Sequence, residues 1–257
     1  MFQTLDLFSG VGGFSLGLER CSSRSGTGGF KTVAFCEIEE FPRRVLKKHW
    51  PDIPIYKDVR ELNAQRLADD GIIPDVITGG FPCTDLSVAG KQGGIEAERS
   101  GLWDELCRLI GDIRPRFAIV ENVSNLLAGP SEQRGGWFGQ VLGDLAEIGF
   151  DAEWHCIPSS YLGGWSRRDR VWILTYPNSG IRPEGESKKP ILRQQHISEF
   201  TERVSPGWRG RSNIPEPKSI GGHPGLSSRL HAIGNSVSPQ IATLIGRAIL
   251  DVEIPKH

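Results

Sequence analysis

The chain has 257 residues, of which 38% are apolar and 24% are charged, and its formal net charge is −1. This composition allows a large hydrophobic core and argues against a disordered or fibrous chain. No apolar run is long enough to span a bilayer, and the first residues lack the basic segment and cleavage site of a signal peptide. The five cysteines are scattered without a C-x-x-C pair. We therefore expect a reducing cytoplasm, no disulfide framework, no metal and no membrane contact.

Charge is distributed unevenly along the chain. Residues 159–231 hold 12 Lys and Arg against 6 Asp and Glu, whereas the remainder holds 18 against 25. A basic segment in a near-neutral protein can bind a polyanion such as a nucleic acid. The same excess fits an ordinary solvated loop, so charge alone does not decide between the two.

The chain opens with a strand, a glycine-rich turn and a helix. Residues 5–8 are a short apolar strand, residues 9–13 read Ser-Gly-Val-Gly-Gly, and helical spacing follows from residue 14. This order is typical of the ligand-binding half of a doubly wound fold, in which glycines let the backbone approach a ligand beside a helix N-terminus. The turn departs from G-x-G-x-x-G and lacks a P-loop lysine, so neither a dinucleotide nor a nucleoside triphosphate is favoured.

Acidic residues follow the next two predicted strands. Residues 32–36 form the second strand, and Glu37 at its end is placed to accept hydrogen bonds from ribose hydroxyls. An ordinary carboxylate near a helix N-terminus is an equally good interpretation of Glu37. A third possible strand, residues 55–59, ends near Asp58. Two helices are expected around it, at residues 41–50 and 62–70.

The loop after the fourth predicted strand holds the best candidate nucleophile. An apolar strand at residues 75–77 leads through Gly79, Gly80, Phe81 and Pro82 to Cys83. A cysteine at the carboxyl end of a strand lies where open α/β sheets place their chemistry, and residues 84–94 could close over the group it attacks. The alternative is a small buried hydrophobic side chain, which is the commoner role of a lone cysteine.

A carboxylate follows the fifth predicted strand. Residues 102–110 have helical spacing, and residues 116–120 form an apolar run typical of a strand buried on both faces. Glu121-Asn122-Val123 comes next. If both strands are central and parallel, Glu121 lies near Cys83, and burial would raise its pKa so that it could donate a proton. The alternative is a structural carboxylate that caps the turn at residues 124–127.

The second half of the chain predicts a helix at 137–148 and an antiparallel strand pair at 154–157 and 171–175, with an arginine-rich stretch between them. Residues 176–228 are rich in Pro, Gly, Ser, Lys and Arg and show no clear period, which indicates an irregular region. An apolar helix at 241–250 should dock on the main core. The predicted fold class is α/β, a doubly wound and mostly parallel sheet with a small irregular insert.

Together these segments resemble the motifs of the DNA (cytosine-5)-methyltransferase family, of bacterial or phage type, through most of the chain and in the same order. The segments are Asp6-Leu7-Phe8-Ser9-Gly10-Val11-Gly12-Gly13, Glu37-Ile38, Asp58-Val59, Phe81-Pro82-Cys83 with Ser87, Glu121-Asn122-Val123, Arg168-x-Arg170 and Gly234-Asn235-Ser236-Val237. The chain differs from the family in Thr84 and Ser166, where Gln is usual, and in a short stretch between residues 175 and 229. The motif that usually precedes the final Gly-Asn is not found.

The resemblance implies the fold of S-adenosylmethionine-dependent methyltransferases and methyl transfer to C5 of cytosine in double-stranded DNA. Cys83 would add to C6 of a flipped-out base, Glu121 would protonate N3, and Arg168 or Arg170 would orient the base. S-adenosylmethionine would leave as S-adenosylhomocysteine, and no metal is required. The implied cofactor-binding residues are Asp6, Phe8, Gly10, Gly12, Gly13, Glu37, Ile38, Asp58, Val59, Gly80, Pro82, Asn235 and Val237.

The resemblance also implies a division of the chain and a set of partners. Residues 1–176 and 233–257 would form the catalytic domain, and residues 177–232 a small target-recognition region. The expected DNA-contacting residues are Ser87, Lys91, Lys188, Lys189, Arg209 and Arg211. We expect a monomer in the cytoplasm of a prokaryotic or phage-infected cell, with a cognate restriction endonuclease as a candidate partner.

Two other classes of protein stay open at this point. One is a DNA-binding relative that has lost catalysis, and the other is an unrelated nucleotide-dependent thiol enzyme on a doubly wound fold. Glu121-Asn122-Val123 and Gly234-Asn235 disfavour the second, because a generic fold does not require them.

Overall fold

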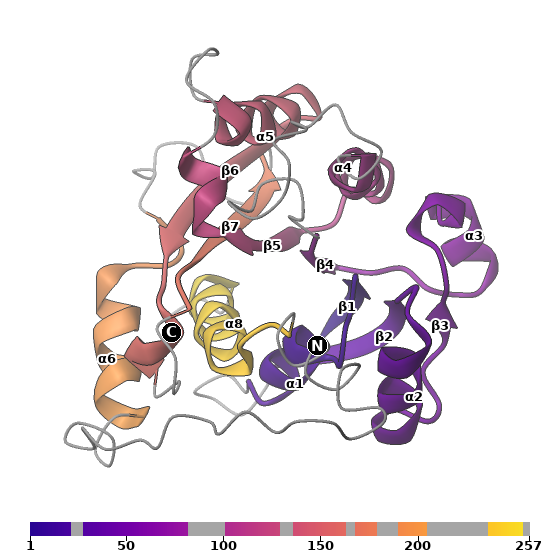
Figure 1. The fold of residues 1–257 in the computed structure, drawn as a ribbon, viewed down its shortest axis with the longest axis horizontal. Coiled ribbons are helices and arrows are strands. Elements are labelled where there is room, and N and C mark those ends of the chain that lie inside the picture. The colour runs from indigo at the N-terminus through magenta and orange to yellow at the C-terminus, as the bar shows by residue number, and fades with distance from the viewer. Residues whose placement is uncertain are drawn as a thin grey trace, which may run out of the picture.

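The structure is a computed structural model that describes residues 1–21, 28–81, 101–128, 136–162, 168–178, 190–204 and 236–253. Its centre is one sheet of seven strands in the order β3-β2-β1-β4-β5-β7-β6 (Figure 1). The strands are β1 Phe2–Leu7, β2 Phe30–Cys36, β3 Ile55–Tyr56, β4 Val76–Gly80, β5 Phe117–Val123, β6 Phe150–Cys156 and β7 Arg170–Pro177. Strands β1 to β5 pair in parallel, and β7 pairs antiparallel with both β5 and β6. The doubly wound, mostly parallel sheet that the sequence predicts is confirmed.

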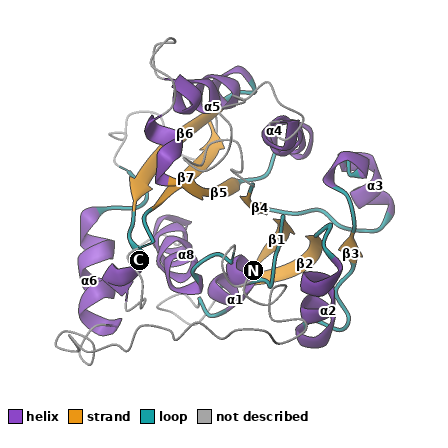
Figure 2. Ribbon diagram, in the orientation of Figure 1, coloured by secondary structure: helices purple, strands orange, loops and turns teal. Residues whose placement is uncertain are grey.

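Helices cover both faces of this sheet (Figure 2). The helices are α1 Gly13–Glu19, α2 Glu40–His49, α3 Ala64–Asp69, α4 Gly101–Ile113, α5 Gly136–Glu147, α6 Gln194–Val204 and α8 Pro239–Glu253, with short 3-10 helices η1 Val59–Glu61, η2 Ser124–Ala128 and η3 Ser159–Leu162. One hydrophobic cluster packs α3, α4 and α5 on the sheet, and a second packs α1, α6 and α8 on the opposite face. The last long helix therefore docks on the main core, as predicted.

Strands β4 and β5 lie side by side at the centre of the sheet. The register pairs Val76 with Phe117 at one end and Gly80 with Glu121 at the other. Every residue of β5 from Phe117 to Asn122 is buried, as expected for a strand covered on both faces. The carboxyl ends of the two strands, which lead to Cys83 and hold Glu121, therefore meet at one edge of the sheet.

The third strand is shorter than predicted. It ends at Tyr56, and the chain turns into η1 because the Asp58 side chain accepts the Arg60 N–H at 3.0 Å. An Asp that satisfies a nearby backbone N–H favours a turn over a continued strand. The Asn63 side chain caps α3 by accepting the Arg66 N–H. This helix therefore begins at Ala64, two residues later than the predicted residue 62.

The expectation that residues 176–228 lack periodic structure is wrong for α6. Ile191, Leu192 and Phe200 are buried in the hydrophobic cluster beneath α1 and α8. The Glu153 carboxylate on β6 also accepts the N–H groups of Ile191 and Leu192 at 2.8 and 2.9 Å. This segment has few apolar residues, so its composition did not predict a helix. Its contacts with the rest of the fold stabilise the helix instead. The rest of the predicted recognition region lies outside the described residues, apart from residues 177, 178 and 190–204.

Candidate active site

The loop after β1 is bound to the end of β2. Ser9 donates its N–H to the Cys36 carbonyl at 3.1 Å, and its Oγ accepts the Cys36 N–H at 3.3 Å. Gly10 and Gly12 have φ angles of 52° and 84°, which glycine adopts without the steric penalty of a side chain. The chain therefore turns sharply at the carboxyl edge of the sheet, beside the position where Glu37 follows β2.

Glu37 links the glycine loop to the segment that enters α2. Its Oε2 accepts the Gly10 N–H and its Oε1 accepts the Glu39 N–H, both at 2.7 Å. Burial raises the pKa of Glu37, while the bonds from Glu39 and Gly10 oppose that rise. Each carboxylate oxygen keeps a further lone pair, so Glu37 can still accept a hydroxyl hydrogen bond. The two interpretations from the sequence are thus compatible, since the same side chain organises the loop and stays available to a ligand.

Ile38 and Asp58 lie near the same edge of the sheet. Ile38 is 63% exposed, so its apolar side chain is accessible from solvent. The N–H of the neighbouring Glu37 donates to the Tyr56 carbonyl at 3.0 Å, which brings the start of η1 close. Asp58 is held by the Arg60 guanidinium, with Nη2 to Oδ2 at 2.7 Å, and this hydrogen bond lowers its pKa. An apolar face beside an ionised carboxylate suits a flat base with an exocyclic amine.

Asp6 has a different position from that of a cofactor contact. It is fully buried, and its Oδ2 and Oδ1 accept the hydroxyls of Ser15 on α1 and Thr78 on β4, each at 2.8 Å. Burial raises its pKa to about 7. Asp6 therefore braces β1, β4 and α1 beneath the glycine loop, and any contribution to a ligand would be indirect.

Four predicted site residues meet beside the end of β4. A Cβ added to Gly13 would come within 2.5 Å of the Val237 carbonyl oxygen. A Cβ on Gly80 would lie 3.4 Å from Glu121 Oε2 and 3.5 Å from Val237 Cγ2. Val237, at the end of the final motif, thus lies against the glycine loop and beside the end of β4.

Glu121 forms a buried ion pair with Arg170 of β7. Arg170 Nε lies 3.0 Å from Glu121 Oε1, across the antiparallel β5–β7 pair. Burial raises the pKa of Glu121, and the positive charges of Arg170 and Arg168 counteract that rise. Burial also lowers the pKa of Arg168, whose backbone has a φ of 30°. Arg170 thus contacts the Glu121 carboxylate directly, and Arg168 adds a second positive charge near it.

The residue just before Pro82-Cys83 is fixed from two sides, which sequence reasoning missed. The Phe81 carbonyl accepts Asn122 Nδ2 at 3.3 Å, and the Phe81 ring packs on Trp103 with 5.4 Å between centroids. Trp103 is itself held by Asp144 Oδ2 of α5, at 2.6 Å from its Nε1. Asn122 was visible as part of the Glu-Asn-Val match, but the contact depends on strand order, which the sequence does not state.

Several predicted site residues lie outside the described residues. They are Pro82, Cys83, Ser87, Lys91, Lys188, Lys189, Arg209, Arg211 and Asn235. Phe8, which has a φ of 51°, and Val59, which is buried in η1, both lie in the segments expected to hold the cofactor.

The described residues fit S-adenosylmethionine. Glu37 offers carboxylate oxygens to a ribose, Ile38 an exposed apolar face to an adenine, and a side chain at Gly10 would meet no atom within 4 Å.

Among the described residues no group of His, Cys, Asp and Glu could hold a metal ion. Within the same residues, no helix has the length and apolar character needed to cross a membrane.

Solved methyltransferases share this fold. A methyltransferase of Entamoeba histolytica aligns with 99% of both chains at a TM-score of 0.66 and 14% identity. A DNA modification methyltransferase described as putative, from an Escherichia coli prophage, covers 75% of this chain at a TM-score of 0.55 and 23% identity. The chain thus shares its fold with these solved proteins.

Sequence comparison then identifies the family. The family model of C-5 cytosine-specific DNA methylases matches residues 2–210, and the chain belongs to this family. Type II methyltransferase M.Sau3AI of Staphylococcus aureus is 33% identical over 184 residues, or 68% of this chain and 43% of that protein. M2.BsuMI of Bacillus subtilis is 32% identical over 243 residues, or 88% and 58%. The chain spans about half the length of most of the curated relatives it matches first.

Proposed function

We propose that this chain transfers a methyl group from S-adenosylmethionine to C5 of cytosine in double-stranded DNA. The observation that carries the proposal is the Glu121–Arg170 pair beside Gly80, three residues before Cys83. An active site needs a proton donor next to the nucleophile, and a buried carboxyl with a raised pKa beside that strand end suits the role. The intact pair also favours an active enzyme over a relative that has lost catalysis.

In this proposal Cys83 and Glu121 divide the activation of the base between them. The target C5 is inaccessible in stacked DNA, so the cytosine must leave the duplex. The Cys83 thiolate forms a bond to C6, and the displaced ring electrons are neutralised by a proton that Glu121 delivers to N3. C5 of the resulting enamine then takes the methyl group. A base then removes the C5 proton, the C6–S bond breaks to release the Cys83 thiolate, and N3 returns its proton to Glu121. These steps restore the aromatic ring and the free enzyme.

Arg170 tunes and positions Glu121 in this scheme. Its positive charge keeps the carboxyl from becoming so weak an acid that it could not release its proton. The same guanidinium can hold negative charge that develops at the base carbonyl. Arg168 lies on the same chain segment, three residues before the buried Val171. Its positive charge also opposes the rise in the pKa of Glu121.

The cofactor supplies an activated methyl group on a positive sulfur, so the protein has only to bind and orient it. We assign the ribose to Glu37, the adenine to Ile38 with Asp58 and Val59, and the methionine end to the region of Gly80, Asn235 and Val237. S-adenosylhomocysteine would be the product. Pro82 and the glycine loop complete the proposed cofactor site.

The test is transfer of a tritiated methyl group from S-adenosylmethionine to mixed-sequence duplex DNA. We expect the wild-type chain to label DNA and Cys83→Ser to lose transfer while binding the cofactor nearly as well, because a serine alkoxide is not available at neutral pH. Appreciable turnover by Cys83→Ser would refute the nucleophile. A wild-type chain that binds S-adenosylmethionine and DNA without transfer would point to a relative that has lost catalysis.

The remaining assignments are proposals of the same kind. We propose a monomer that acts on DNA in the cytoplasm of a prokaryotic or phage-infected cell, beside a cognate restriction endonuclease. Residues 1–176 and 233–257 would carry catalysis. The stretch 177–232 would carry target recognition apart from residues 190–204, which pack on the core. Ser87 and Lys91 would contact DNA from the Cys83 segment. Bisulfite sequencing of DNA from cells that express the chain would reveal the methylated sequence.

A further inference from the structure

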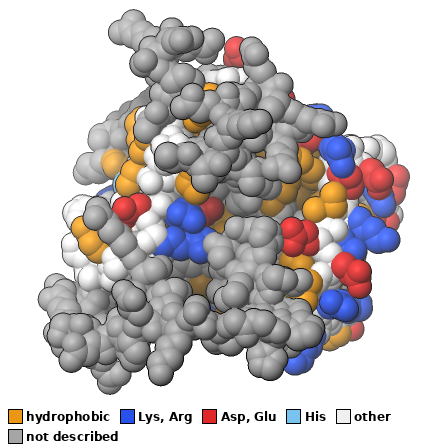
Figure 3. All heavy atoms as spheres, in the orientation of Figure 1, with side chains coloured by type: hydrophobic (Ala, Val, Ile, Leu, Met, Phe, Trp, Pro, Cys, Tyr) orange, Lys and Arg blue, Asp and Glu red, His pale blue; other side chains and the backbone are white. Residues whose placement is uncertain are grey.

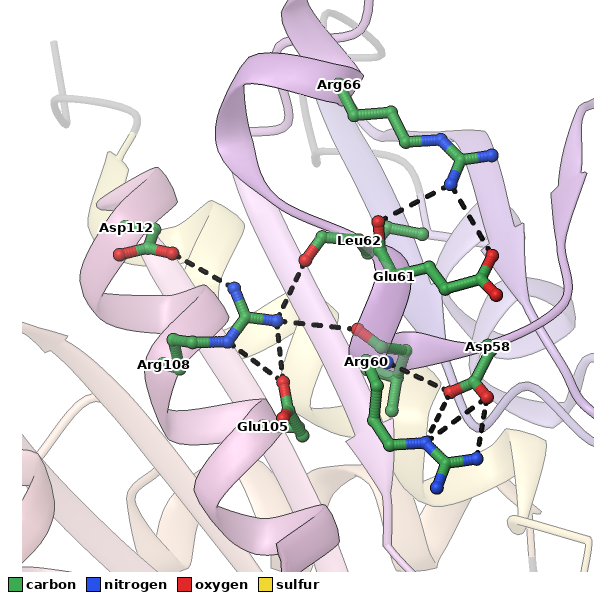
Figure 4. A network of polar contacts seen from close by, with 9 residues as sticks. Asp58, Arg60, Glu61, Leu62, Arg66, Glu105, Arg108 and Asp112 are labelled. Carbon is green, nitrogen blue, oxygen red and sulfur yellow. Dashed lines mark hydrogen bonds and ion pairs between the residues drawn. The ribbon is translucent and has the colours of Figure 1, made fainter.

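Arg108 of α4 is held at once by its own helix and by η1. Its Nη2 donates to the Leu62 carbonyl at 2.8 Å and to the Val59 carbonyl at 3.5 Å (Figure 4). Glu105 Oε2 accepts from the same guanidinium at 2.6 and 2.9 Å, and Asp112 Oδ2 accepts at 3.1 Å. The two carboxylates, one helical turn away on either side, fix the guanidinium so that its remaining donors point at η1.

The carbonyls that Arg108 contacts belong to the segment that carries Asp58 and Val59. Arg60 holds the Asp58 carboxylate from within that segment, whereas Arg108 holds its backbone from outside. A guanidinium presents several donors in a fixed plane, so it can span carbonyls and carboxylates at the same time. A lysine ammonium, as a single point of charge, cannot reach all of them. Arg108 therefore fixes where Asp58 and Val59 stand relative to α4.

Helix α4 also contacts the other half of the proposed site. It begins at Gly101, directly after the residues 82–100 that include Cys83 and lie outside the described residues. Trp103 in its first turn packs on Phe81, the residue that precedes Pro82-Cys83. One rigid helix thus touches both η1, through Arg108, and the end of β4, through Trp103.

We infer that Arg108 is a positioning residue that couples cofactor binding at η1 to helix α4. The inference rests on the proposed function, because it takes Asp58 and Val59 as the adenine side of the cofactor site. When a ligand orders η1, the Arg108 bonds transmit that order to α4. Because the coupling is reciprocal, the same hydrogen bonds restrain η1 in the free protein near the conformation that binds the ligand.

The experiment is amide hydrogen exchange with and without saturating S-adenosylhomocysteine, together with calorimetric titration. In the wild-type protein the ligand should slow exchange both at residues 58–62 and in α4. Arg108→Met should lose most of the ligand-dependent protection in α4 and bind about 5- to 10-fold more weakly. This is only part of the effect of losing a hydrogen bond from a charged donor, because Arg108 acts on the ligand through η1. Arg108→Lys should fall between the two.

Arg66→Met is the matched control. Arg66 bonds to the carbonyl and the carboxylate of Glu61, at 3.4 and 3.7 Å, within the same segment. Its removal should leave the α4 response and the affinity near those of the wild type. A folded Arg108→Met protein with unchanged affinity and unchanged α4 protection would overturn the inference, and Arg108→Lys serves the same comparison if the Met variant does not fold. A wild-type protein that binds no S-adenosylhomocysteine would overturn the proposed function and the inference together, so the two failures are distinct.

Discussion

At the scale of single residues, two buried carboxyls near the glycine loop do different work. Glu37 is 8% exposed and faces the proposed ligand, whereas Asp6 is wholly enclosed by Ser15 and Thr78. Sequence similarity placed both in the cofactor site, because a motif match does not say which way a strand residue points. The residues flanking Asp6 on β1 point to the opposite face, as the alternation of a strand requires.

Glu37→Ala should weaken binding of S-adenosylmethionine by roughly 1–3 kcal/mol, the usual value of hydrogen bonds to a charged acceptor. The loss has two sources, since the carboxylate would accept from the ribose and also braces the Gly10 N–H. Isothermal titration calorimetry measures the change. Glu40→Ala is the control, because Glu40 is an exposed carboxylate in the first turn of the same helix α2. Equal affinities for the wild type and Glu37→Ala would leave only a helix-terminal role for Glu37.

Asp6→Asn should change the pH dependence of stability in a defined direction. The folded-state pKa of Asp6, about 7, lies above its ordinary value of 3.8, so Asp6 costs no stability below that lower value. The cost grows as pH rises and is complete above the folded-state pKa. Since one pKa unit corresponds to ~1.4 kcal/mol, ionised Asp6 costs the folded state about 4 kcal/mol at pH 8.

The measurement is urea unfolding at pH 5, 6, 7 and 8 for both proteins. The free energy of unfolding of Asp6→Asn should rise relative to that of the wild type across this range, because the amide does not ionise. The difference between the two proteins at pH 5 serves as the reference. It already includes any pH-independent change in the hydrogen bonds to Ser15 and Thr78. A difference between the two proteins that stays constant from pH 5 to 8 would contradict the buried, titrating carboxyl.

At the scale of elements, the site exists because β4 and β5 are neighbours. The sequence predicted both strands and the residues at their ends, since each is a short apolar run followed by chemically distinctive side chains. The sequence alone did not show that the two strands are neighbours. The structure shows it, because the β4–β5 register pairs Gly80 with Glu121. The contact of Arg170 with Glu121 required the antiparallel β5–β7 pairing as well, which the sequence alone could not place next to β5.

Helix α6 marks the limit of composition as a guide. Its segment has high polarity, but Ile197, Phe200 and Val204 stand at helical spacing, a short pattern that the composition of residues 176–228 concealed. What secures it is a distant carboxylate, Glu153, whose two bonds to the N–H groups of Ile191 and Leu192 fix the chain on the edge strand β6. Residues 190–204 consequently pack as part of the core.

Glu153→Ala should therefore destabilise the protein by about 1–3 kcal/mol, because two buried N–H groups lose their acceptor. Urea unfolding gives the change in free energy, and limited proteolysis should show faster cleavage around residues 190–204. Glu40→Ala again provides an exposed control, with a change within about 0.5 kcal/mol. If Glu153→Ala left both stability and cleavage unchanged, the anchoring of this segment to β6 would be wrong.

At the scale of the whole molecule, positive and negative charges are mixed on the described surface, whereas the excess of positive charge lies in one stretch of the sequence. Acidic and basic side chains alternate over the region of α2 and α3, at the right of Figure 3. Such mixed charge produces little net field for a polyanion. The excess of Lys and Arg lies in residues 159–231, most of which are outside the described residues. These residues therefore hold the net positive charge that could meet a polyanion.

Lys188 and Lys189 test the electrostatic part of the proposed DNA recognition. Changing both to Gln should weaken binding to every duplex and lower the slope of log affinity against log salt by about 2, because each phosphate contact contributes roughly 0.9. Fluorescence anisotropy with two unrelated duplexes at several salt concentrations measures both effects. Lys47→Gln with Lys48→Gln is the matched control, a pair in the last turn of α2. An unchanged salt slope in the Lys188 and Lys189 variant would remove these lysines from the DNA contacts.

The choice of sequence should reside in residues 206–228, and α6 determines how this can be tested. Deleting residues 180–220 would remove Ile191, Leu192 and Phe200 from the core and confuse lost recognition with lost folding. Replacing residues 206–228 by a Gly-Ser linker of equal length spares every described residue. The replaced stretch includes Trp208, Arg209 and Arg211, side chains suited to a DNA groove. We expect the variant to bind S-adenosylmethionine as the wild type does and to lose methylation at the sites that bisulfite sequencing identifies. Methylation of the same sequence by the linker variant would mean that the α/β domain itself selects the target.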